Sequence, residues 1–104
     1  MDVATAMLVA LDDGIAGACV TMLSDAGFRV IRVKHVAPAL ERMPVVMPHL
    51  VIIPTNLSKD DDDSLVDRSV AVGAEIVRLS PDGDERALAA LVASAAHASL
   101  QKDR

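Results

Sequence analysis

The stretch that decides the fold is PHLVIIPTN, residues 48–56, a short apolar run enclosed by two prolines. Leu50 to Ile53 carry no polar side chain, which is typical of a strand buried on both faces of a parallel sheet. Proline lacks the N–H group that a sheet ladder uses, so Pro54 is expected at the strand's end. Polar Thr55 and Asn56 follow at once. The sequence therefore predicts a buried strand whose carboxyl end opens into a loop.

Three other short runs have the character of strands, and stretches with helical spacing of apolar residues separate them. The runs are Met7–Leu11, Arg29–Lys34 and Glu75–Leu79. The charges of RVIRVK, residues 29–34, predict an edge or partly exposed strand. Strands that alternate with helices indicate βαβ units, and hence a parallel sheet with helices on both faces and right-handed crossovers.

Four helices are expected between and after these strands. The expected helix ends follow from three signals: acidic residues at a helix start, a proline in the first turn, and a glycine just beyond the last turn. The predicted helices run from Asp12-Asp13-Gly14 to Gly27, from Pro38 to Pro44, from about Ser64 to Val72, and from about Asp84 to Leu100. No Gly- or Pro-rich linker divides the chain, so we expect a single domain over residues 1–104.

Composition narrows the possible functions. The chain has 104 residues, 52% hydrophobic and 24% charged, which suits a globular protein. Phe28 is the only aromatic residue and the net charge is −5, so base stacking and phosphate binding are both disfavoured and no nucleic-acid partner is expected. Cys19 is the only cysteine. No apolar run is long enough for a membrane span and no signal-peptide pattern begins the chain, so we expect a cytoplasmic protein without a membrane partner.

Three motifs in order, MLVALDDG, GFRVIRVKHVAPALERM and PHLVIIP, carry a resemblance to a known family. Within residues 5–54 they resemble the receiver domain of two-component response regulators. They match its first strand with an acidic pair, its second strand and helix, and its third strand. The resemblance implies a CheY-like fold, a three-layer α/β/α flavodoxin-like sandwich. A full receiver has five strands and five helices, so about one βα unit is missing here and we expect a truncated parallel sheet of about four strands.

The resemblance also implies a set of site residues. In receivers the acidic pair binds Mg²⁺, an aspartate that ends the third strand accepts a phosphoryl group, a Thr or Ser ends the fourth strand and a Lys ends the fifth. Asp12 and Asp13 match the acidic pair, and Pro54 stands at the phospho-acceptor position. Ser80 matches the Thr/Ser position, although GAEIVRLSP also aligns with G-A-x-x-Y-L-x-K-P, which would put Ser80 on the lysine. Together with Thr55, these residues form a vestigial acidic pocket.

The chemistry of these residues argues against catalysis. A proline ring has no nucleophile to attack phosphorus, so aspartyl-phosphate chemistry is not expected. For Asp12 and Asp13 we favour helix capping, and expect weak Mg²⁺ binding at best. No phosphate loop, nucleotide-binding glycine pattern or nucleophile–base pair is present, so neither an enzyme nor a cofactor is expected. The run KDDDD, residues 59–63, lacks EF-hand spacing; we interpret it as a solvated loop, with docking of a basic partner left open.

We therefore expect the protein to act through an interaction surface. The last predicted helix is rich in small residues that let another backbone approach, and the fourth strand would be an exposed edge. The candidate interaction surface comprises Ala87, Ala90, Ser94, Ala98 and Val77. Our hypothesis is a non-catalytic pseudo-receiver that acts through phosphorylation-independent protein–protein interaction, in signalling or scaffolding, possibly as a homodimer. The alternative is a small flavodoxin-like domain that binds a ligand or divalent cation at the carboxyl ends of its strands.

Overall fold

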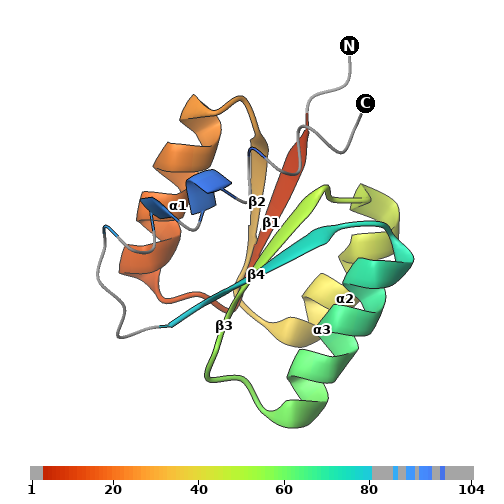
Figure 1. The fold of residues 1–104 in the computed structure, drawn as a ribbon. Coiled ribbons are helices and arrows are strands. Elements are labelled where there is room, and N and C mark those ends of the chain that lie inside the picture. Colours follow the sequence, from red (N-terminus) through yellow and green to blue (C-terminus); the bar gives the residue numbers. More distant parts are fainter. Residues whose placement is uncertain (1–3, 81–85, 87–88, 91, 95–96, 98–104) are drawn as a thin grey trace.

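The computed structural model describes residues 4–80, 86, 89–90, 92–94 and 97. They form one parallel four-stranded sheet with the strand order β2-β1-β3-β4 (Figure 1). The elements are β1 (Thr5–Val9), α1 (Asp13–Asp25), β2 (Arg29–Val33), α2 (Val36–Val46), β3 (Leu50–Pro54), α3 (Lys59–Ala71) and β4 (Glu75–Leu79). The predicted α/β architecture is confirmed.

The two central strands carry the core of the sheet. Every residue of β1 and β3 is buried, as their unbroken apolar sequences predict. By contrast, Arg29 and Arg32 of β2 are exposed, so the charges in RVIRV do mark a sheet edge. His49 joins the two central strands at their amino ends. Its N–H donates to the Thr5 carbonyl at 2.8 Å and its Nδ1 accepts from the Thr5 N–H at 3.1 Å.

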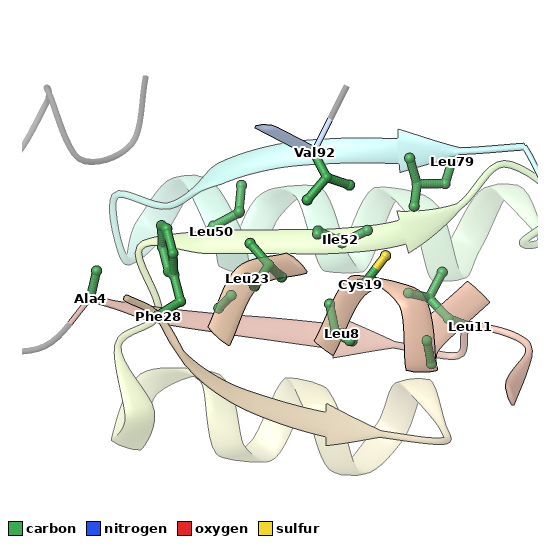
Figure 2. Close-up of a cluster of buried hydrophobic side chains, with 12 residues drawn as sticks. Ala4, Leu8, Leu11, Cys19, Leu23, Phe28, Leu50, Ile52, Leu79 and Val92 are labelled. Carbon is green, nitrogen blue, oxygen red and sulfur yellow. The ribbon is translucent and has the colours of Figure 1, made fainter. Parts of the chain in front are cut away.

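Helices cover both faces of the sheet and create two separate cores (Figure 1). On one face, Cys19 and Leu23 of α1 pack over Leu8 and Ile52 (Figure 2). On the other face, α2 and α3 cover a second cluster of buried residues: Met7, Val9, Val33, Ala39, Met43, Val51, Ile53, Leu65 and Ala74. These three layers are the flavodoxin-like arrangement that the sequence predicts.

The helical residues described after β4 bear on whether a further strand could follow β4 in the sheet. A right-handed crossover from β4 to a further strand beyond it would place its helix on the face that α3 covers. The helical residues described after β4 instead include Val92, which is fully buried in the α1-side cluster near Leu79 (Figure 2). Within the part of the chain that the structure describes, β4 is therefore a sheet edge, and no helix follows α3 on its face.

Two boundaries differ from prediction for backbone reasons. β1 covers residues 5–9 rather than 7–11, because Ala10 adopts a left-handed conformation (φ 57°) that a strand cannot continue through. α2 passes through Pro44, where the sequence predicts its end, and stops at Val46 before left-handed Met47 (φ 53°). A proline this near a helix end removes one hydrogen bond without stopping the helix.

The third helix begins five residues earlier than predicted. The sequence interpretation of residues 59–63 as a solvated loop is wrong, because Lys59 to Asp63 form the first turns of α3. Ser58 is the N-cap, and its Oγ accepts a hydrogen bond from the Asp61 N–H at 3.2 Å. The acidic side chains then lie at the positive end of the helix dipole, where negative charge stabilises a helix. No helix among the described residues is long and apolar enough to cross a membrane.

Candidate functional site at the carboxyl edge of the sheet

The sequence-predicted site residues lie beyond the carboxyl ends of the strands. Asp12 and Asp13 follow β1, Thr55 follows β3 and Ser80 follows β4. Parallel strands bring these ends to one edge of the sheet, where folds of this class bind ligands. All four residues are exposed. The edge therefore presents polar side chains on the expected elements, and their chemistry depends on what each one contacts.

One member of the acidic pair, Asp13, contacts a basic side chain of the neighbouring strand β2. Asp12 holds the N-cap position of α1, but its side chain makes no capping hydrogen bond, so that part of the capping interpretation is wrong. Asp13 is the first residue of α1, and its Oδ1 accepts a hydrogen bond from Arg32 Nη2 of β2. This contact lowers the pKa of the Asp13 carboxyl, and the nearby charge of Lys34 acts in the same direction.

The position after the third strand carries no nucleophile. Pro54 is the last residue of β3, is buried, and pairs in register with Leu79 of β4. The next residue, Thr55, donates its N–H to the Leu79 carbonyl at 3.0 Å. That bond places Thr55 beside the end of β4, directly before Ser80. Because β4 pairs with β3, Ser80 follows the strand that is fourth both in the chain and in the sheet, as in the Thr/Ser alignment.

The side chains described at this edge provide few ligands for a magnesium ion. Mg²⁺ is held by oxygen ligands, usually one or two carboxylates with waters and substrate phosphate. Pro54 offers no side-chain ligand, and the Arg32 guanidinium already contacts Oδ1 of Asp13. Among the residues that can be described, no three His, Cys, Asp or Glu side chains are grouped so that they could hold a metal ion.

Further acidic side chains lie along the start of α3, and two of them are paired. Arg78 of β4 makes a two-pronged contact with Asp62: Nε donates to Oδ2 at 3.1 Å and Nη2 donates to Oδ1 at 2.8 Å. This contact lowers the pKa of Asp62 and raises that of Arg78. Lys59 Nζ donates to Asp63 Oδ2 at 2.8 Å, one helical turn away. Asp62 and Asp63 are thus paired with basic side chains, and the contact between Asp62 and Arg78 joins α3 to β4.

Residues of the predicted interaction surface fall on two elements. Val77 is half-buried on β4. Ala90 and Ser94, in the last helix, are exposed. Ala87 and Ala98 lie outside the described residues. The sequence interpretation missed the two arginines, Arg32 and Arg78, because their carboxylate partners are distant in the chain. The serine before KDDDD was a usable signal that a helix starts there.

Comparison with known proteins supports the fold. No protein-family model matches the chain, and no curated protein matches it. Among solved structures, it is similar to a de novo designed Rossmann 2x3 fold protein (TM-score 0.63, 13% identity, 97% of this chain and 91% of that one). It is also similar to a response regulator from Desulfuromonas acetoxidans (TM-score 0.62, 23% identity, 88% of this chain and 77% of that one). At these identities the similarity establishes a shared CheY-like fold.

Proposed function

We propose that this domain is a pseudo-receiver, a receiver-like scaffold that acts by protein–protein interaction and independently of phosphorylation. The observation that carries the proposal is Pro54, buried at the carboxyl end of β3. In the receiver arrangement this position belongs to the aspartate that accepts the phosphoryl group. Proline has neither a carboxylate to attack phosphorus nor a free backbone N–H, so a covalent phosphoryl intermediate has no acceptor there.

The neighbouring residues support the same proposal. Asp13 is engaged by Arg32, so one of the two carboxylates that match the receiver's metal-binding pair already has a cationic partner. The hydroxyl of Thr55 is adjacent to Pro54, but a threonine hydroxyl is a poor nucleophile unless a general base activates it. An interaction surface is then the remaining way for the scaffold to act, and the edge strand β4 is our candidate for it.

The test is treatment with a small-molecule phosphodonor and Mg²⁺, followed by intact-mass measurement. We expect no acid-labile phosphoryl adduct, whereas a receiver with its acceptor aspartate, treated in parallel, gains one. A stable adduct on this chain contradicts the proposal. The variant Pro54→Asp extends the test. If Arg32 also blocks the site, Pro54→Asp stays unmodified, and adding Arg32→Ala is required before any adduct forms.

A second arm addresses the interaction itself. The elution volume of the protein in size-exclusion chromatography should be the same with and without the phosphodonor. A change in association that depends on the phosphodonor contradicts phosphorylation independence, even where no adduct survives mass measurement.

A further inference from the structure

We infer that the outer edge of β4 pairs with the same edge of a second copy of this chain, in antiparallel orientation, to form a continuous eight-stranded sheet. This inference deepens the proposed function by naming the partner and the contact. It rests on four observations: the direction of the backbone groups of β4, the symmetry of its side chains, the charges on the two sheet edges, and an apolar flank of α3.

The backbone of β4 presents a regular set of outward groups. The Glu75 N–H donates to the His49 carbonyl at 2.9 Å, and the Leu79 carbonyl accepts from the Thr55 N–H at 3.0 Å. Backbone groups alternate in direction along a strand, so residues 75, 77 and 79 face β3. The N–H and C=O groups of Ile76 and Arg78 therefore point away from the sheet, and no hydrogen bond between described residues uses them.

These outward groups are self-complementary about a two-fold axis at Val77. In antiparallel pairing, Ile76 of one copy lies opposite Arg78 of the other, and each such pair exchanges two hydrogen bonds. The two symmetric pairs give four backbone bonds. Val77 then faces Val77 of the second copy across a non-hydrogen-bonded position, where side chains come closest. An isologous two-fold contact of this kind closes on itself, which is the usual form of a homodimer.

Charge distinguishes β4 from the other sheet edge. β2 and the residue after it carry Arg29, Arg32 and Lys34. Asp13 pairs with Arg32, but Arg29 and Lys34 remain as basic side chains that keep two such edges apart. β4 carries one acid and one base, Glu75 and Arg78, so its net charge is zero. In addition, Asp62 holds the Arg78 guanidinium against α3 and neutralises it, which removes the repulsion that the arginine would otherwise cause.

The flank of α3 nearest this edge is apolar beyond Asp62. Val66 and Val70 follow Asp62 at intervals of four residues and so lie along the same side of the helix. Val66 is half-buried and Val70 is 67% exposed, which is unusual among the large apolar residues that the structure describes. Pairing through β4 brings the α3 helices of both copies to the same face, one on either side of the axis, where these valines would be covered.

The experiment is size-exclusion chromatography with multi-angle light scattering of the full chain at high micromolar concentration. We expect the wild type to be a dimer. Val77→Lys and Val77→Glu should each be monomeric, because they place like charges directly opposite each other. An equimolar mixture of the two variants should recover the dimer mass. That recovery separates a broken interface from a misfolded chain.

Matched controls define the edge and the register. Ile31→Lys, at the centre of β2, makes the same change on the opposite edge and should leave the dimer intact. In a Cys19→Ala background, Val77→Cys should form an intermolecular disulfide under mild oxidation, because the paired Cα atoms would be about 4.5 Å apart. Glu75→Cys should not, because its two copies would be separated by about 14 Å along the strands.

Several results overturn the inference. They are a monomeric wild type, a Val77→Lys variant as dimeric as wild type, a dimer lost with Ile31→Lys instead, or faster cross-linking through Glu75→Cys. Failure here is distinguishable from failure of the proposed function. A monomer that takes no phosphoryl group retains the pseudo-receiver proposal and calls for a different protein partner, whereas a phosphoryl adduct removes that proposal whatever the oligomeric state.

Discussion

Replacing Val92 with alanine tests whether the helix that contains it packs on the α1 side of the sheet. Val92 is fully buried against the α1 side of the sheet and, of the described residues of the last helix, it is the one buried in that cluster (Figure 2). The substitution removes two carbon groups worth about 0.8 kcal/mol each and leaves a small cavity. We expect the free energy of unfolding to fall by about 2 kcal/mol, or the melting temperature by about 8–16 °C for a domain of this size.

The measurement is urea unfolding followed by far-UV circular dichroism, since the chain has no tryptophan or tyrosine for fluorescence. All variants are compared at one protein concentration, because self-association would add to stability. Ala93→Ser is the matched control, because Ala93 is next to Val92 in the chain and its side chain is exposed. This substitution should change the free energy of unfolding by no more than about 0.5 kcal/mol. If Val92→Ala lowers the free energy of unfolding no more than this control does, the last helix does not pack on the α1 side of the sheet, and its position no longer makes β4 a sheet edge.

Three other predictions concern caps, charges and the thiol. Ser58→Ala should lower stability by about 1 kcal/mol through loss of the α3 cap, whereas exposed Ser64→Ala should have little effect; equal losses would show that the cap contributes nothing. Arg78 lowers the pKa of Asp62, so the pair stabilises the fold above the ordinary carboxyl pKa of 3.8, and this contribution is lost as pH falls through the lower folded value. The free energy of unfolding, measured from pH 7 down to pH 2, should therefore fall less in Asp62→Asn than in wild type. Parallel curves for the two proteins would contradict the pairing. Burial raises the pKa of Cys19, so a thiol reagent at pH 8 should react slowly with native protein and rapidly in denaturant; equal rates would place this thiol at the surface.

The acidic run at the start of α3 illustrates how local and tertiary effects combine. Adjacent aspartates repel one another, which argued for a loop. The N-cap at Ser58, the helix dipole and the contact with Arg78 together offset that repulsion. The first of these is visible in the sequence as a serine three residues before Asp61. The last depends on Arg78 of β4, which is sixteen residues from Asp62 in the chain. Only the packing of α3 beside β4 brings the two side chains together.

Strand identity and order of elements followed from the sequence because they depend on local patterns. The unbroken apolar run at 50–53 predicted a central strand, and the arginines of 29–33 predicted an edge. Pro54 could also be identified as a residue without nucleophilic chemistry, since that depends on its covalent structure alone. Boundaries were less accurate where backbone conformation decided them, as at Ala10 and Met47, whose left-handed dihedrals have no signal in the side chains.

Only the tertiary structure determined which groups meet across the sheet. The pairing of Asp13 with Arg32 joins residues on neighbouring elements, and no local sequence pattern connects them. The burial of Val92 on the α1 side decided which face the last helix covers, and so left β4 as the open edge of the described sheet. Hydrophobic periodicity shows that a helix has an apolar side, but the face it covers depends on the handedness of the crossover and on which surface is still uncovered.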